Sequence, residues 1–132
     1  IRDSDSRGAV FCTVFFGNDK KIMIGRAFGS VVVFDVKTAR REVVIQVHSA
    51  GIKGIVVRKD GRFAIAGGGE ARNPITGKKQ WGSVWVIDIE RKKVLHTYKT
   101  KSPVTTICET IDGKQLIVGE RDGTLSVLEF VK

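Results

Sequence analysis

Short apolar runs alternate with polar or glycine-containing breaks along the whole chain. β-branched and other apolar residues recur in segments of a few residues, each bounded by Gly, Asp, Asn, Ser or Lys. No stretch keeps the i, i+3, i+4, i+7 spacing of an amphipathic helix for three turns. Short strands bounded by turn residues predict an all-β fold, and their even spacing is typical of a sandwich, a barrel or a propeller.

An internal repeat favours the propeller. Similar segments begin at Phe11, Ile52 and Val104, and each continues with an Asp eight residues later, a second strand ending in Gly, and a third strand opening with Gly and a hydroxyl residue. The first two starts are 41 residues apart and the last two 52, and the excess lies between Gly67 and Gly82. Without that excess the period fits the roughly 40–45 residues of a four-stranded propeller blade.

The repeat predicts a single section of three antiparallel four-stranded blades, of which the last lacks its fourth strand. Blade 1 should span about residues 9–48, blade 2 about 50–100 with an insertion at 70–80, and blade 3 about 102–132. The expected first strands are 11–16, 52–57 and 104–109, the second 21–25, 62–67 and 114–119, the third 30–36, 83–89 and 124–130, and the fourth 42–47 and 93–98. The side chains expected to be buried between blades are Val14, Ile55, Ile107, Val33, Val86 and Val127.

The repeated residues resemble the WD40-repeat β-propeller family. They share a His before a first strand, an Asp-Gly hairpin, a Gly-Ser/Thr opening of the third strand and an aromatic-Asp ending. The family's signature Trp is replaced by Phe34, Ile87 and Leu128, and Val47 stands before His48 where the family has Gly. A YVTN-type or other seven-bladed propeller would show a similar pattern. The resemblance implies a non-catalytic scaffold that binds other proteins within a multi-protein complex.

Three blades do not make a closed ring, because closed propellers have roughly four to eight. A three-blade wedge would leave two apolar faces in water, since each blade packs only on its neighbours. The polar segment Ile1–Gly8 does not supply the missing strand, and the chain begins with Ile rather than Met. We therefore expect a section of a larger propeller, or a ring completed by blades from the same or another chain.

The net charge of +9, from 23 Lys and Arg against 14 Asp and Glu, suggests an alternative to the protein-binding scaffold. Such a surplus attracts polyanions, so a nucleic-acid-associated, RNA-binding module is a second hypothesis, and solubility is the plainer interpretation of scattered basic residues. Proteins that bind single strands align stacking aromatics, whereas Trp81, Trp85 and Tyr98 are dispersed. The scaffold hypothesis therefore comes first.

Candidate catalytic chemistry is scarce. No Ser/His/Asp or Cys/His set has a meaningful spacing, and Cys12 and Cys108 alone cannot form a zinc site. Residues 67–69 are three glycines without the Gly-Lys-Ser/Thr of a phosphate loop. We expect no enzyme activity, no cofactor and no metal. Reduced thiols and the lack of an apolar run of about 18 residues favour an intracellular protein, in the cytoplasm or nucleus, without membrane attachment.

The insertion is the candidate binding site. Loops longer than a repeat requires tend to carry function. The resemblance implies that the loops between second and third strands share one face with the loops between blades. That face would gather a partner-binding set of Arg72, Lys78, Lys79, Trp81, His48, Lys53 and Lys101. The alternative is a tolerated surface hairpin, with Trp81 packed on its own blade and His48 bonded within its blade.

Overall fold

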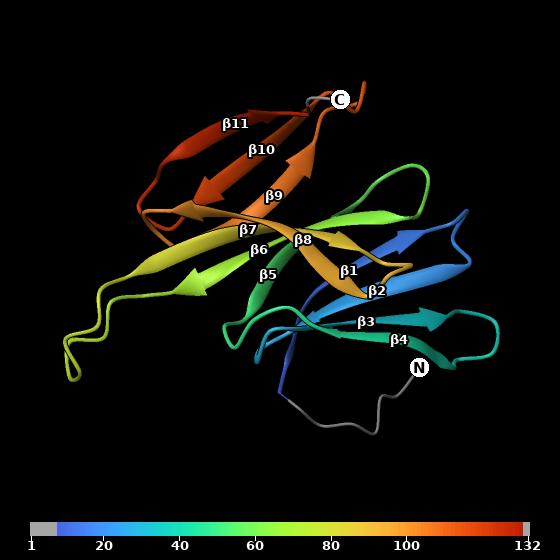
Figure 1. The fold of residues 1–132 in the computed structure, drawn as a ribbon, viewed down its shortest axis with the longest axis horizontal. Helices are drawn as coiled ribbons and strands as arrows, with labels where there is room; N and C mark the ends of the chain where they lie inside the picture. The colour runs from blue at the N-terminus through green and yellow to red at the C-terminus, as the bar shows by residue number, and fades with distance from the viewer. Residues whose placement is uncertain (1–7, 131–132) are drawn as a thin grey trace.

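The structure, a computed structural model, describes residues 8–130 as eleven strands in three antiparallel sheets (Figure 1). The first sheet contains β1 (Val10–Phe16), β2 (Lys21–Arg26), β3 (Ser30–Asp35) and β4 (Arg41–Gln46). The second contains β5 (Ile52–Val57), β6 (Phe63–Glu70), β7 (Trp81–Asp88) and β8 (Lys93–Thr100). The third contains β9 (Val104–Glu109), β10 (Gln115–Glu120) and β11 (Leu125–Glu129). The expected all-β architecture of propeller blades is confirmed.

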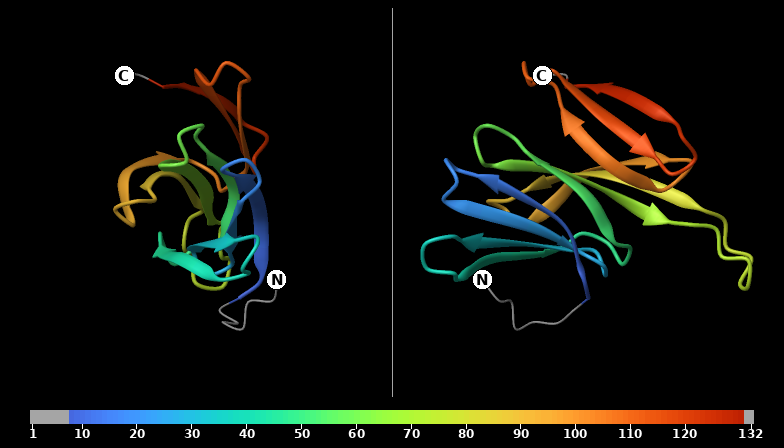
Figure 2. Two further views of the ribbon diagram at one scale, coloured as in Figure 1. Left: turned by 90° about the vertical axis from the view of Figure 1, so that its right-hand side faces the viewer. Right: turned by 180° about the vertical axis from the view of Figure 1, so that it is seen from behind.

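The sheets follow one another as consecutive blades (Figures 1 and 2). Strands pair in chain order within each sheet, and β5 lies against both β1 and β9, so the first strands are neighbours. Among the described residues the third sheet has three strands and ends at β11. The expectation that Ile1–Gly8 supplies no strand concerns residues 1–7, which lie outside the described part of the chain.

Aspartates fix the tight turns between strands. In the turns after β5 and β9, Asp60 accepts the Arg62 N–H at 2.9 Å and Asp112 accepts the Lys114 N–H at 3.0 Å. The next residues, Gly61 and Gly113, have φ values of +70° and +71°, a region in which a side chain is strained. The Asp-Gly pairs of the repeat therefore act as hairpin signals.

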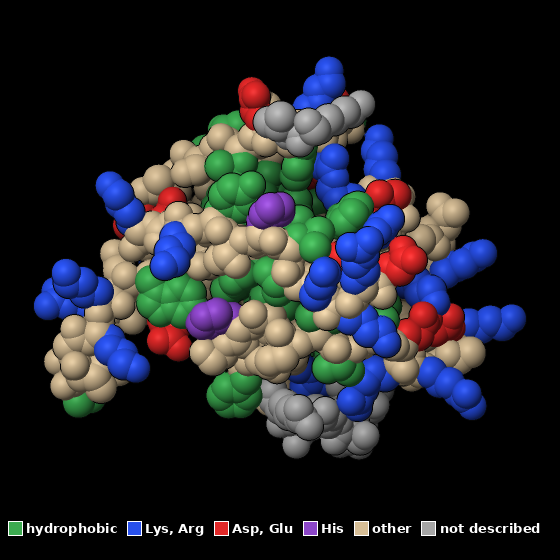
Figure 3. Space-filling model, viewed as in Figure 1, with side chains coloured by type: hydrophobic (Ala, Val, Ile, Leu, Met, Phe, Trp, Pro, Cys, Tyr) green, Lys and Arg blue, Asp and Glu red, His purple; other side chains and the backbone are tan. Residues whose placement is uncertain are grey.

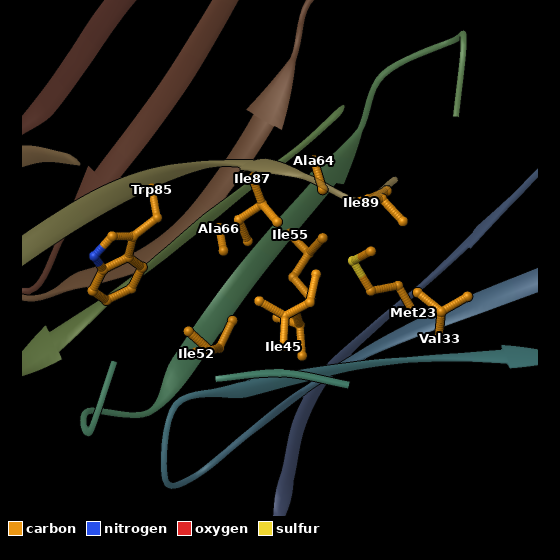
Figure 4. Packing of buried hydrophobic residues seen from close by; sticks show 11 residues of the cluster. Met23, Val33, Ile45, Ile52, Ile55, Ala64, Ala66, Trp85, Ile87 and Ile89 are labelled. Carbon is orange, nitrogen blue, oxygen red and sulfur yellow. The ribbon is translucent and has the colours of Figure 1, made fainter. Parts of the chain in front are cut away.

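Large apolar side chains fill the space between the first and second sheets. Figure 4 shows side chains of both sheets converging there, among them Met23, Val33, Ile45, Ile52, Ile55 and Ile87. Ile52 is fully buried and lies over Gly25 of β2, where an added Cβ would come within 2.6 Å of the Ile52 Cγ2 atom. The glycine that ends the second strand therefore leaves the space into which the first strand of the following blade packs.

Three of the six residues expected between blades are buried. Val33, Ile55 and Ile107 belong to the core, and Val14 and Val86 are half-buried. Val127 is 52% exposed, so its predicted burial is wrong. It lies on the side of the third sheet that faces away from the second, and no described blade covers that side.

The insertion lengthens two strands beyond their expected ends. β6 continues to Glu70 and β7 already begins at Trp81, because these two residues pair across the ladder. The connecting loop therefore comprises residues 71–80 and projects away from the second sheet (Figures 1 and 2).

Candidate partner-binding surface

The loop 71–80 is exposed along its entire length, yet it is internally ordered. The Asn73 side-chain oxygen accepts the N–H groups of Ile75 at 2.9 Å and Thr76 at 3.2 Å. The Asn73 backbone N–H donates to the Lys78 carbonyl at 3.0 Å, which closes the loop. These bonds hold the backbone of the loop, from which the exposed basic side chains extend.

Trp81, at the base of this loop, meets His48 from the connection between the first two sheets. Their ring centroids are 4.8 Å apart, and the His48 ring also stacks on Trp85 at 5.7 Å with an interplanar angle of 24°. Trp85 is 1% exposed, whereas Trp81 is half-buried against the core. Two segments 33 residues apart therefore build one aromatic cluster.

A hollow of about 600 Å³ opens beside this cluster, and we name it the His48–Trp81 hollow. Lys78 and Lys99 contribute to its lining together with Glu70, and the two tryptophans supply an apolar wall. Figure 3 shows hydrophobic, histidine and basic side chains gathered on the face that carries the loop. The arrangement suits an apolar side chain that is flanked by acidic groups.

The His48 ring has a defined hydrogen bond. Its Nδ1 atom accepts the Ala50 N–H at 3.3 Å, and the Ser49 hydroxyl lies at the same distance from Nδ1. A nitrogen that accepts a backbone N–H carries no proton, so the neutral ring holds its proton on Nε2. The Nε2–H group is then the donor available to a partner.

The remaining expected residues lie apart from the hollow. The Lys53 ammonium sits 3.5 Å from the centroid of the Phe11 ring on neighbouring first strands. Lys101 lines a different hollow, of about 420 Å³, between the second and third sheets. Arg72 and Lys79 are exposed on the loop itself. Of the seven expected residues, the structure brings His48, Trp81 and Lys78 together.

Sequence reasoning missed Lys99, Glu70 and the role of Trp85. Lys99 pairs with Ser83 across β7 and β8, and Glu70 pairs with Trp81 across β6 and β7. Pairing the residues of the predicted β6–β7 and β7–β8 hairpins one by one from the insertion would have placed Glu70 and Lys99 near Trp81. The stacking of Trp85 on His48 carries no comparable sequence signal, because it depends on how two sheets pack.

A second basic surface lies at the opposite end of the strands from the loop. The β3–β4 and β7–β8 turns carry exposed basic side chains, and Figure 3 shows Lys and Arg gathered toward that side. These residues are Lys37, Arg40, Arg41, Arg91, Lys92 and Lys93. The positive charge that looks scattered in sequence is therefore partly concentrated by the fold.

Other site chemistry is limited in residues 8–130. This part of the chain contains no group of three or more His, Cys, Asp or Glu side chains arranged to hold a metal ion. It also contains no helix that is long and apolar enough to cross a membrane. The turn aspartates hold backbone N–H groups: Asp88 accepts the Arg91 N–H at 3.0 Å, and this bond, with the nearby Arg62 guanidinium, lowers the pKa of Asp88.

Comparisons with known proteins agree with this architecture. No family model matches the sequence. A curated protein of Dictyostelium discoideum, described as a WD repeat-containing protein 3 homolog, is 27% identical over 123 residues, which cover 88% of this chain and 12% of that protein. The β-propeller domain of Myceliophteria thermophila Cps50 (Swd1) superposes with a TM-score of 0.75 at 17% identity, covering 100% of this chain and 36% of that one. The chain thus spans only a fraction of the length of each.

Proposed function

We propose that the chain is a section of a WD40-repeat β-propeller and that it is a non-catalytic scaffold that binds other proteins, which its similarity to a WD repeat-containing protein and to a β-propeller domain supports. The observation that carries the proposal is the His48–Trp81 hollow, in which a half-buried tryptophan lies beside an exposed, ordered basic loop. Tryptophan is enriched among residues that dominate interface energies, and basic side chains around it speed association with acidic partners. Free thiols at Cys12 and Cys108 suit action inside the cell, in the cytoplasm or nucleus.

The partner best suited to this surface is an acidic protein segment with an apolar anchor. The anchor would pack on Trp81, and its acidic flank would face Lys78 and Lys99. Arg72 and Lys79, farther out on the loop, would steer the approach, whereas Lys53 and Lys101 lie apart from the hollow and take no part in this contact. His48 would donate from Nε2 to a carbonyl or carboxylate of the partner.

Further blades, from the same or another chain, complete the ring in this proposal. The third sheet lacks a fourth strand among the described residues, and a hollow of about 330 Å³ remains beside β11. Apolar side chains, including Ile65, Val86, Leu128 and Phe130, line it. This hollow lies between the second and third sheets, beside the edge strand β11, so a fourth strand from a longer chain or from a partner would cover it.

The test replaces residues 71–80 with a two-residue turn and measures capture of protein partners from cell extract. We expect partners to be lost while the melting transition stays within a few degrees. A finer variant, Lys78→Glu with Lys79→Glu, should weaken capture with its strongest effect on association rate. The matched control is Lys37→Glu with Arg40→Glu, the same charge reversal at the opposite end. Unchanged capture by the loop variants would contradict the proposal.

The basic turns support a second candidate, binding of RNA or another polyanion. Five exposed cations besides Arg41 lie on the β3–β4 and β7–β8 turns. Binding driven by phosphate contacts loses affinity steeply as salt rises, with a slope of about −0.7 per contact on single strands. A salt series with a single-stranded RNA oligonucleotide tests this candidate, because a flat response or no binding at low salt excludes it.

A further inference from the structure

The outer strand of the second sheet, β8, has a free edge that borders the His48–Trp81 hollow. The sheet order β5-β6-β7-β8 leaves one side of β8 without a neighbouring strand among the described residues (Figure 2). Four residues of β8 line the hollow, namely Val94, Thr97, Lys99 and Thr100. The rest of the lining comes from β6, β7, the loop 71–80 and the connection between the first two sheets. Hollow and edge are therefore built without any residue of the third sheet.

The ladder shows which backbone groups of β8 face outward. In an antiparallel sheet, successive residues direct their N–H and C=O groups to opposite sides of the strand. Directly after β7, the Ile89 N–H donates to the Arg62 carbonyl at 2.8 Å, so odd-numbered residues of β7 bond to β6 and even-numbered ones bond to β8. From residue 96 to residue 100, even-numbered residues of β8 pair with even-numbered residues of β7. The backbone groups of Thr97 and Lys99 therefore point away from β7.

These outward groups lie in a regular stretch of the edge. Within residues 8–130, no strand or turn offers the outward N–H and C=O groups of Thr97 and Lys99 a backbone hydrogen bond. A register shift makes Leu95 a bulge, and the ladder is regular from residue 96 to residue 100. Because a bulge hinders pairing at a sheet edge, the regular stretch beside the hollow is the part of β8 that can accept another strand.

Charge separates this edge from the outer edge of the first sheet. In β4, Glu42 pairs with Lys21 of its own sheet, and no residue of β4 lines the hollow. β8 carries Lys93 and Lys99 and no acidic residue, and Lys99 forms no ion pair within the described part of the chain. Lysines on a free edge disfavour pairing with a second copy of the same strand, and opposite charges on paired strands attract. The edge of β8 therefore suits an acidic strand.

We propose that an extended segment of a protein partner adds a strand to the free edge of β8 and forms main-chain hydrogen bonds with Thr97 and Lys99. The inference rests on the proposed function, and it specifies how the partner's segment binds. Main-chain bonds supply affinity in this mode of recognition, and pockets for alternate side chains supply specificity.

The hollow gives the added strand its side-chain preference. Alternate side chains of a strand fall on opposite faces of the sheet, so those directly opposite Thr97 and Lys99 face the His48–Trp81 hollow. An apolar side chain at such a position would pack on Trp81. Acidic side chains two residues before and after it share the same face and would lie toward Lys78 and Lys99.

Proline at an outward-facing residue tests the main-chain contact. Proline lacks an N–H and is tolerated on an edge strand where that N–H faces solvent. Thr97→Pro should therefore remove an edge donor and keep the sheet, whereas Thr97→Ala removes only side-chain atoms. The matched control is Val44→Pro, because Val44 follows the register shift of β4 by the same count as Thr97 follows that of β8. The Val47 N–H donates to the Gly29 carbonyl at 2.9 Å, so the Val44 N–H also faces outward.

The probe is a fluorescein-labelled peptide, Thr-Glu-Thr-Phe-Thr-Glu-Thr, which places one phenylalanine and two glutamates on the same face. Fluorescence anisotropy should show that it binds the wild-type chain and binds Thr97→Pro about tenfold more weakly or worse. Thr97→Ala and Val44→Pro should change the Kd by less than about threefold. Circular dichroism checks that each variant is folded. By NMR of the wild-type chain, exchange of the Thr97 and Lys99 amide hydrogens with solvent should slow when the peptide binds.

Equal affinity of the wild-type chain and Thr97→Pro would overturn the inference. So would Thr97 and Lys99 amides that exchange equally fast with and without peptide, or a peptide that does not bind at millimolar concentration. The scaffold proposal is tested separately, by partner capture through the loop 71–80, so each can fail alone. Capture that is lost in the loop variants but unchanged in Thr97→Pro would mean that the partner occupies the hollow without adding a strand.

Discussion

Truncating the first residue of each first strand should cause a graded loss of stability, because Ile52 packs over Gly25 and Val104 over Gly67, whereas Val10 is 48% exposed. Ile52→Ala removes three buried carbons, at about 0.8 kcal/mol each, and leaves a cavity over Gly25, so the expected loss is about 2–5 kcal/mol. Val104→Ala removes two buried carbons, so about 1.6 kcal/mol is lost before any cavity cost. Val10→Ala should lower the free energy of unfolding by at most about 0.8 kcal/mol, because its two removed carbons are half in solvent.

Urea unfolding followed by tryptophan fluorescence measures these three values. Trp85 is 1% exposed beside the same cluster, so its emission should shift when the first two sheets separate. Equal losses for Val10→Ala and Ile52→Ala, or a loss below about 0.5 kcal/mol for Ile52→Ala, would refute the packing argument.

Three further predictions concern charge and ionisation. Burial raises the pKa of Cys12 to about 11, so iodoacetamide at pH 8 should label the exposed Cys108 first, as mass spectrometry of the digested chain would show. Asp88→Asn should lower the urea midpoint at pH 7, and this difference should disappear as the pH falls below about 4, because a carboxyl with a lowered pKa stabilises the fold only while it is ionised. Arg58 pairs with Glu109 and donates to the Gly113 carbonyl at 3.0 Å, so Arg58→Ala should cost about 1 kcal/mol, with a double-mutant cycle using Glu109→Gln isolating the ion pair.

Strand positions and blade order were accessible from sequence because they depend on local signals. Alternation, Asp-Gly pairs and the repeat placed every strand within two or three residues of its observed bounds. The alignment of Phe11 with Ile52 and Val104 was wrong by one residue, because the ladder places Val10 at their position. Burial depends in addition on what covers a face. Val33 and Ile55 lie between two blades, whereas Val127 occupies a corresponding strand with no described blade beyond it. The sequence pattern is the same in each case, so it could not predict which face is left open.

The candidate surface was also predictable only in part, because local signals mark its loop but not how neighbouring sheets pack. The insertion, with the loop placement that the family resemblance implies, predicted that Trp81 and His48 lie on one face. In the structure their ring centroids are 4.8 Å apart. Lys53 lies at the register shift of β5 and its ammonium contacts the Phe11 ring, whereas Lys101, in the connection before β9, lines a hollow between the second and third sheets. Which side a residue takes near a register shift is a property of the ladder, and spacing along the chain does not reveal it.

Site-specific photo-crosslinking tests the central claim, that the loop face binds a protein partner, most directly. A photoreactive amino acid at position 79 lies on the exposed loop, and one at position 40 lies on the β3–β4 turn at the opposite end. We predict a protein crosslink from position 79 that disappears in the Trp81→Ala variant, and none from position 40. A protein crosslink confined to position 40, or nucleic acid as the crosslinked species at either position, would contradict a scaffold that binds its partner at the His48–Trp81 hollow.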